Sequence, residues 1–294
     1  MVEVVRTGTL SVAVEVTGPA DGRPALLLHG WPDGPRTWDG VLPAIHDAGW
    51  RTVVPTLRGF GSTTFHQGEP PVGDLEALGQ DVLDLVGGMQ LERPVVVGHD
   101  WGARAAYIAS MLAPERIAAC VGVSVGWGTN VPDQPLSLRQ TQNYWYHWLF
   151  ATPRGERMVR EDRRALTSYL WRLWAPGWDF DAATFAATAE AFDNPAWPDV
   201  TLSSYRVRWD HAPAAARYGA IRRRQADDPA IAVPTMTLHG GADPVNAPET
   251  SEGREAMFRG PYERRVLPGL GHFPQREDPD AVARHLVDAL AMAA

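Results

Sequence analysis

The sequence has little cysteine, no long hydrophobic run and no cluster of residues spaced to bind a metal ion. Its single cysteine, Cys120, lies in an apolar run, so we expect a small core residue in a reducing compartment. No apolar stretch approaches the roughly 18 residues of a membrane-spanning helix. The first residues also lack a signal-peptide pattern, so a soluble cytoplasmic protein is expected.

Several classes of cofactor and partner are excluded in the same way. No histidine or cysteine cluster has the spacing of metal ligands. The glycine pairs at 87–88 and 240–241 lack the downstream Lys or Ser/Thr of a phosphate-binding loop. A net charge of −8 and an isoelectric point near 5.6 argue against nucleic acid and anionic membranes as partners. We therefore expect no metal and no cofactor, and the oligomeric state stays open, a homodimer included.

What the chain does have is a large apolar fraction in a regular pattern. Hydrophobic residues make up 45% of 294 residues, which is ample for a large core. Residues 2–18 favour a β-hairpin, since apolar residues alternate from Leu10 to Val16. Continuous apolar runs predict buried strands, and helical spacing predicts helices between them. The expected strands are 25–28, 52–54, 94–97, 117–125, 235–238 and 263–267, and the expected helices are 38–48, 75–89, 101–112, 248–258 and 279–292.

The alternation of strands and helices stops in the middle of the chain. From Trp127 to about Asp228 no convincing parallel strand can be found, and the segment is rich in helix formers, Arg, Trp and Pro. We interpret this segment as a helical lid inserted after the sixth predicted strand. The prediction is an α/β fold, with residues 1–126 and 231–294 forming one core and residues 127–230 forming the lid.

The most informative motif follows the strand at 94–97. Residues 98–102 read Gly-His-Asp-Trp-Gly and are followed by an alanine-rich helix, which is the form of a nucleophile elbow. The glycines are needed because the turn is too tight for side chains on either side of a strained residue. The central residue is Asp100 rather than serine. A carboxylate at this position favours attack on an alkyl carbon, such as that of an epoxide or haloalkane, with an aspartate ester as the intermediate.

An aspartate nucleophile needs a base to activate water and an acid to orient that base. His272 follows the last strand and lies downstream of both other members, so we predict it as the base. The predicted acid is Asp243, in the loop after the strand at 235–238, where a side chain points toward the same crevice as the elbow. Asp133, just after the strand at 117–125, is the alternative acid. The predicted oxyanion hole consists of the backbone N–H groups of Trp31 and Trp101.

At this point the chain resembles the epoxide hydrolase and haloalkane dehalogenase branch of the α/β-hydrolases. The motifs that carry the resemblance are HGWPD at 29–33, RGFGS at 58–62, GHDWG at 98–102, and GHF at 271–273 with Glu277 and Pro279. The resemblance covers both halves of the core, in matching order and spacing. It implies an eight-stranded, mostly parallel sheet with helices on both faces and a helical lid.

The lid distinguishes the two activities of this branch. Opening an epoxide produces an alkoxide that needs a proton, and the resemblance to epoxide hydrolases implies two lid tyrosines that supply it. Tyr146 lies in an aromatic segment that ends in Pro153, with Tyr144 as the competing choice. Tyr205 precedes Arg206 late in the lid, as the pattern requires. The chain is therefore closest to epoxide hydrolases and is expected to convert a small apolar epoxide and water to a vicinal diol.

Some positions depart from the patterns and leave alternatives open. Trp31 stands where dehalogenases of this branch often carry Asn or Glu, and Ser204 stands where an aromatic residue often precedes the second tyrosine. A haloalkane dehalogenase with the same triad is the second hypothesis. Fluoroacetate-type enzymes carry arginines one and four residues after the nucleophile; here these are Trp101 and Arg104, so half of that clamp is missing. We interpret Arg104 as packing and pairing beneath the elbow helix. A ligand receptor on a hydrolase scaffold is the remaining alternative.

Aromatic residues indicate where a substrate would bind. Eight of the twelve tryptophans lie between residues 127 and 209, in or next to the lid. Aromatic side chains provide large apolar surfaces, in a binding cavity or in the core of the lid. The predicted pocket residues are Trp31, Trp101, Trp145, Trp148 and Phe273.

Overall fold

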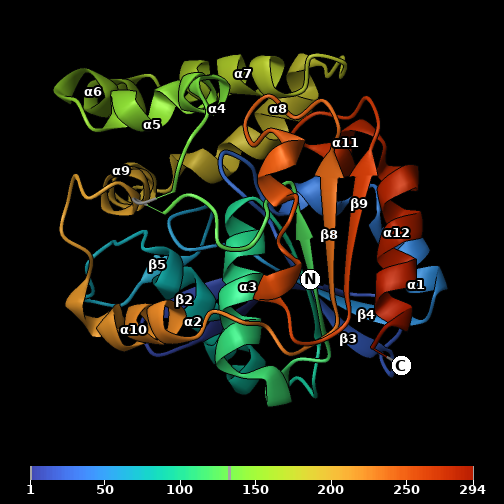
Figure 1. The fold of residues 1–294 in the computed structure, drawn as a ribbon. Coiled ribbons are helices and arrows are strands. Elements are labelled where there is room, and N and C mark those ends of the chain that lie inside the picture. The colour runs from blue at the N-terminus through green and yellow to red at the C-terminus, as the bar shows by residue number, and fades with distance from the viewer. Residues whose placement is uncertain (1, 132–133, 294) are drawn as a thin grey trace.

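A twisted sheet runs through the middle of the molecule and carries helices on both sides (Figure 1). The computed structural model describes residues 2–131 and 134–293. Within these residues the sheet has nine strands, which are β1 (Val2–Arg6), β2 (Leu10–Thr17), β3 (Arg23–Leu28), β4 (Trp50–Pro55), β5 (Thr64–Phe65), β6 (Val95–His99), β7 (Ala119–Val123), β8 (Thr235–Gly240) and β9 (Tyr262–Leu267). The ninth, compared with the eight expected, is the two-residue strand β5.

The strand order is β1-β2-β4-β3-β6-β7-β8-β9, and β5 pairs with the first two residues of β2. The predicted hairpin at 2–18 is confirmed, because β1 and β2 are antiparallel with Val4 opposite Ala13. β2 is also antiparallel to β4, whereas every later neighbour pair is parallel. The parallel strands therefore end at one edge of the sheet, and the loops that follow β3, β6, β7 and β8 converge there.

Successive residues of the central strands face opposite layers of the core. Leu27 and Val97 pack in a cluster with Leu286, on the side of α1 (Leu42–Asp47) and α12 (Pro279–Ala291). Leu28 and Val96 belong to the other cluster, on the side of α2 (Leu75–Gly88) and α3 (Trp101–Leu112). Strands buried on both faces need apolar residues at every position, which explains the continuous runs in the sequence.

Among the described residues between β7 and β8, six helices lie over the carboxyl ends of the strands (Figure 1). They are α4 (Leu138–Asn143), α5 (Trp145–Phe150), α6 (Pro153–Glu161), α7 (Arg163–Trp174), α8 (Ala182–Ala189) and α9 (Trp197–Arg208). Several start at a side-chain cap, since Ser137, Thr152 and Asp181 each accept a backbone hydrogen bond from three residues ahead. A further helix, α10 (Gly219–Asp227), lies lower and contacts α3. The lid boundaries at 127 and 230 stay a prediction.

Two predicted helices are shorter or absent. The predicted helix at 248–258 is wrong: the structure has two 3-10 turns, at Pro248–Ser251 and Glu255–Met257. Gly253, whose φ is +66°, interrupts the segment between them. The predicted helix at 38–48 is reduced to α1, which follows a separate 3-10 turn at Pro35–Trp38. Among the described residues, no helix combines the length and apolar character needed to cross a membrane.

Candidate active site

Asp100 occupies the sharp turn between β6 and α3. Its backbone has φ +50° and ψ −110°, a conformation that L-residues rarely adopt. A Cβ atom on Gly98 would overlap the carbonyl oxygen of Gly102, and one on Gly102 would overlap the carbonyl oxygen of Leu28. The strand and the helix therefore approach so closely that only glycine fits on either side. This packing holds Asp100 at the end of the strand.

The Asp100 carboxylate is buried and hydrogen-bonded to a backbone donor. Its Oδ1 accepts a hydrogen bond of 2.9 Å from the backbone N–H of Trp31, in the loop after β3. Trp101 is the first residue of α3, so its N–H has no partner within the helix and lies at the positive end of the helix dipole. The two backbone donors predicted for an oxyanion hole thus follow neighbouring strands: Trp31 lies in the loop after β3, and Trp101 begins the helix after β6.

His272 lies between two carboxylates. Its Nδ1 is 2.8 Å from Oδ2 of Asp243, and its Nε2 is 3.8 Å from Oδ2 of Asp100. Burial disfavours the imidazolium, but the charges of Asp243 and Asp100 outweigh burial and raise the pKa of His272 above 6.5. The same pairing lowers the pKa of Asp243 despite its complete burial. Asp243 is therefore an ionised partner that orients the ring.

The backbone around this pair is held by further hydrogen bonds. Oδ1 of Asp243 accepts from the N–H groups of Val245 and Asn246, at 2.7 and 3.1 Å. The carbonyl oxygen of His272 accepts from Nε2 of His99 at 2.7 Å and from the hydroxyl of Ser124 at 3.0 Å. Burial lowers the pKa of His99 to about 4, so its ring is neutral and carries the proton on Nε2. The alternative acid, Asp133, lies outside the described residues.

Two tyrosines from the lid close the site from above. Tyr146 on α5 and Tyr205 on α9 are buried, with ring centroids 5.4 Å apart. Tyr146 stacks on Trp31 at 5.8 Å, and Tyr205 lies 5.7 Å from Trp101. Burial raises the pKa of both phenols well above 10, and the nearby Asp100 charge raises it further. Both hydroxyls consequently stay protonated at neutral pH.

Tyr144, the competing choice for the first lid tyrosine, lies elsewhere. Its hydroxyl is hydrogen-bonded to the side chains of Asn130 and Asn246, the latter at 2.8 Å. Its ring stacks on His147 rather than on Trp31. The structure thus places Tyr146, and not Tyr144, with Tyr205 beside the elbow.

The predicted pocket residues separate into two groups. Trp31, Trp101 and Phe273 are fully buried, and Phe273 lies 5.2 Å from the ring of His272. Trp148 is not part of this group: its indole donates to the carbonyl of Thr141 and its ring packs on Trp209. Trp145 is only partly buried; its ring contacts Tyr146 and, on the other side, the exposed Tyr169.

Comparison with known proteins shows the family of the chain. A family model described as the alpha/beta hydrolase fold matches residues 24–279. The chain belongs to this family. A curated relative of the hydrolase, "Epoxide hydrolase A" of Mycobacterium tuberculosis, is 26% identical over 98% of this chain and 96% of its own.

Solved structures extend the similarity over the whole hydrolase. A candidate epoxide hydrolase from Klebsiella pneumoniae has a TM-score of 0.92 and 37% identity, covering 98% of this chain and 96% of its own. Another, from Pseudomonas aeruginosa, has a TM-score of 0.82 and 25% identity, covering 100% and 96%. The chain thus spans nearly the full length of these relatives, lid included.

The hydrolase site also includes aromatic residues that were not among the predicted pocket residues. Trp174, from the end of α7, is 5.2 Å from the ring of His272 and 5.0 Å from that of Tyr146. Trp197, at the start of α9, stacks 6.0 Å from Trp31. The sequence shows these tryptophans only as members of an aromatic-rich lid. Nothing local distinguishes them from Trp148, which packs outside the site.

Buried polar groups of the hydrolase site that have no hydrogen-bond partner within the described residues include the indole N–H groups of Trp101 and Trp197 and Nε2 of His272. Buried polar groups are normally paired, so these groups are open to a partner from outside the protein. No group of three or more His, Cys, Asp or Glu side chains in the described part of the chain is arranged to hold a metal ion.

Proposed function

We propose that the protein is an epoxide hydrolase that forms an alkyl ester on Asp100 and hydrolyses it with water activated by His272. The observation that carries the proposal is the pair of buried, protonated phenols, Tyr146 and Tyr205, beside an aspartate nucleophile. A phenol can bind the epoxide oxygen and give it a proton, which a halide leaving group would not need. The names of the relatives support the same activity.

In the first step, Oδ2 of Asp100 attacks one epoxide carbon, and the bond between that carbon and the ring oxygen breaks. The oxygen leaves as an alkoxide and takes a proton from Tyr146 or Tyr205, which hold it on the side opposite the nucleophile. Oδ1 of Asp100, already bonded to the N–H of Trp31, becomes the carbonyl oxygen of the ester. The driving force is relief of ring strain, and proton transfer from the phenol avoids release of the more basic alkoxide.

In the second step, His272 takes a proton from water while the new hydroxide attacks the ester carbonyl carbon. The carbonyl oxygen becomes an oxyanion that the backbone N–H groups of Trp31 and Trp101 stabilise. Collapse of this tetrahedral intermediate breaks the ester bond and releases the product as an alkoxide. Two protons from the water are now held, one on His272 and one on the new hydroxyl of Asp100. One of them protonates the alkoxide to complete the diol, and the other protonates the tyrosinate. One water is therefore consumed for each epoxide.

A haloalkane dehalogenase with the same triad is the second candidate, favoured by one observation. The unpaired indole N–H of Trp101 is the kind of donor that a halide would bind. The indole N–H of Trp31, in contrast, is occupied, because it donates to the hydroxyl of Thr201 at 3.0 Å. The indole N–H of Trp197 is also unpaired among the described residues, so the site offers a halide two candidate indole donors.

The deciding assay measures diol formation from styrene oxide and from an aliphatic epoxide, next to halide release from short chloro- and bromoalkanes. We expect diol and no halide. Halide release without diol would support the dehalogenase, and tight binding with turnover of neither would support a receptor.

The covalent route is tested by a single turnover in heavy-oxygen water. The oxygen added to the first diol comes from the Asp100 carboxylate, so the label should appear in Asp100 and not in the product. Label in the diol of the first turnover would show direct attack by water and remove the ester from the mechanism. The wild-type protein over many turnovers, in which label must reach the diol, is the control.

A further inference from the structure

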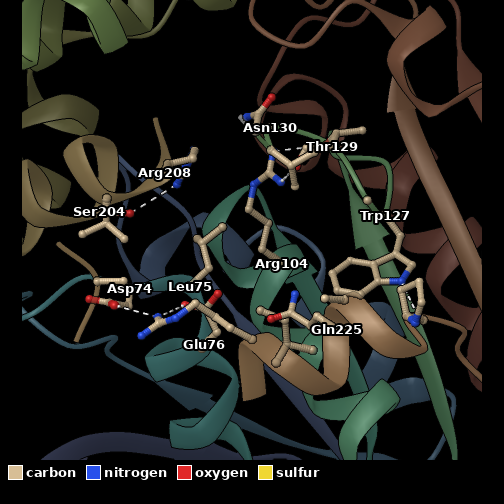
Figure 2. A pocket seen from close by; sticks show the side chains of 18 of the residues that line it. Asp74, Leu75, Glu76, Arg104, Trp127, Thr129, Asn130, Ser204, Arg208 and Gln225 are labelled. Carbon is tan, nitrogen blue, oxygen red and sulfur yellow. Dashed lines mark hydrogen bonds and ion pairs between the residues drawn. The ribbon is translucent and has the colours of Figure 1, made fainter. Parts of the chain in front are cut away.

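A cavity of about 490 Å³ lies beside α3 (Figure 2). Its walls come from the start of α2, from α3, from the loop after β7, from the end of α9 and from α10. Neither Asp100 nor Tyr146 nor Tyr205 lines it. Most of the wall is apolar and includes Ile108, Trp127, Val207 and Met257.

Two buried arginines enter this cavity from opposite elements. Arg104 of α3 and Arg208 at the end of α9 are 3% and 7% exposed. Arg104 donates to the backbone carbonyl and the hydroxyl of Thr129, at 2.8 and 3.3 Å, and Arg208 donates to the hydroxyl of Ser204 at 3.2 Å. Figure 2 shows Arg104 extending from α3 toward Thr129. In each guanidinium the buried Nε has no partner among the described residues.

Neither arginine forms an ion pair with a carboxylate of residues 2–131 or 134–293. The pairing expected for Arg104 from the sequence is thus absent there. Asp74 and Glu76 line another part of the cavity, but both are paired with Arg222 at 3.0 Å. Asp210 also lines the cavity and is exposed.

The electrostatic cost of this arrangement falls on Arg104. Burial, followed by the positive charge of Arg208, lowers its pKa to about 10. Two like charges in a poorly solvated site repel each other, and each loses hydration that neutral hydrogen bonds replace only in part. An anion between them would remove both penalties at once. The apolar wall would at the same time favour a hydrophobic body attached to that anion.

We propose that this cavity binds a carboxylate carried on an apolar chain, with Arg104 and Arg208 holding the carboxylate. Guanidinium groups offer paired N–H donors that match the two oxygens of a carboxylate. The side chains of Ile108, Trp127, Val207 and Met257 would contact the chain. This binding site goes beyond the epoxide chemistry and does not depend on it.

The site has a direct physical connection to the lid tyrosines. The guanidinium of Arg208 lies 4.8 Å from the centre of the Tyr205 ring, and its charge favours ionisation of that phenol. Neutralising Arg208 with an anion would therefore make Tyr205 a weaker proton donor. The carboxylate can belong to the substrate itself or to a separate molecule, and the two sources have different kinetic consequences.

The test is direct binding of octanoate, with 1-octanol as the uncharged analogue of similar shape. Binding is measured at pH 7 by calorimetry and by intrinsic tryptophan fluorescence, in the wild type, Arg104→Gln and Arg208→Gln. We expect octanoate to bind more tightly than octanol, and each substitution to weaken octanoate binding about ten- to a hundredfold while leaving octanol unaffected. Arg223→Gln, which changes an exposed arginine of α10, is the matched control and should bind octanoate as the wild type does.

Equal binding of octanol and octanoate, or octanoate binding that survives both substitutions, would overturn the proposal. Thermal unfolding establishes whether each variant is folded. If Arg104→Gln does not fold, Arg208→Gln alone is sufficient for the binding test. The source follows from turnover: a substrate carboxylate is indicated if Arg208→Gln raises the KM of a carboxylate-bearing epoxide but not of its methyl ester. A separate ligand is indicated if octanoate slows turnover of a neutral epoxide. Octanoate binding is measured without turnover. The binding proposal can therefore be confirmed even if the protein does not hydrolyse epoxides.

Discussion

His272 lies between two carboxylates, and this position decides the pH at which it can act as a base. Only the neutral ring can take a proton from water, whereas Asp243 and Asp100 stabilise the charged ring. The pairing that orients His272 therefore also restricts its activity in acid. The lid tyrosines impose no comparable limit near neutral pH, because burial keeps them protonated.

We predict that the rate of ester hydrolysis falls as the pH decreases through the pKa of His272, which lies above 6.5. Below that pKa the ring is an imidazolium and cannot accept a proton; above it the rate should reach a plateau. The measurement is single-turnover decay of the aspartate ester between pH 5 and pH 9, with circular dichroism to confirm the fold at each pH. A midpoint below 6.5 would contradict the proposed role of the two carboxylates.

The tyrosines give a second prediction for single residues. Tyr146→Phe and Tyr205→Phe each remove one donor to the epoxide oxygen and should lower kcat/KM for an epoxide at least tenfold, and the double variant about 10²- to 10⁴-fold. Tyr169→Phe changes an exposed lid tyrosine and serves as the control. Undiminished diol formation by the double variant would refute proton donation by these residues. Halide release, if the protein has that activity, should survive.

Among the elements, the β6–α3 turn depends most strictly on its sequence. Gly98 and Gly102 are required by the closeness of strand and helix, where the atoms that a Cβ would meet are backbone atoms and cannot move aside. Helices of the lid have more freedom. They are fixed at their starts by caps such as Ser137 and Thr152 and otherwise by the side they bury.

We predict that Gly98→Ala lowers the free energy of unfolding by about 1–3 kcal/mol or more and also displaces Asp100. The added methyl group overlaps the backbone at Gly102, so relief requires the helix to move. Chemical denaturation measures the stability, and formation of the Asp100 ester measures the displacement. Gly177→Ala is the matched control, because no atom lies within 4 Å of its Cβ position. Equal stability of the two variants would contradict the packing argument.

At the scale of the whole molecule, a few buried hydrogen bonds join the lid to the core. The side-chain amide of Asn194 donates to the carbonyls of Phe60, Gly61 and Thr63, at 3.3, 2.9 and 2.8 Å. The indole of Trp171 donates to the carbonyl of Pro32 at 2.7 Å. The first contact holds the loop of Phe60, whose ring lies 6.3 Å from that of Trp101, and the second holds the loop of Trp31, which donates to Asp100. The lid therefore contributes to the shape of the site beyond supplying tyrosines.

Asn194→Ala should leave these carbonyls without a donor and lower the free energy of unfolding by about 1–3 kcal/mol. The lid amides should exchange faster with solvent because the connection is weakened. Denaturation and hydrogen exchange measure the two effects. Asn143→Ala is the control, since the side-chain nitrogen of Asn143 has no partner among the described residues. Unchanged exchange in the lid would show that other contacts hold it in place.

Much of the core and the site could be predicted from local patterns. The strands at 94–97 and 235–238 are continuous apolar runs because both faces of the sheet are covered. Asp100 is marked by flanking glycines, whereas Asp243 and His272 are marked by their positions after strands. Each of these signals lies within a few residues, and the order of the three residues along the chain predicts their roles. The helix predicted at 248–258 is absent because Gly253, with a positive φ, interrupts the segment despite its helical periodicity.

The positions of the lid side chains were beyond this kind of reasoning. A tryptophan in a helix-rich segment has the same local surroundings whether it contacts His272, as Trp174 does, or packs outside the site, as Trp148 does. The side that each helix buries depends on how it contacts residues far away in the chain. For the same reason the sequence could not tell that Arg104 would lack a carboxylate partner in the described residues. The sequence determined the candidate catalytic residues because they depend on residue types at short spacing. The shape of the binding space depends on long-range packing, so only the tertiary structure decided it.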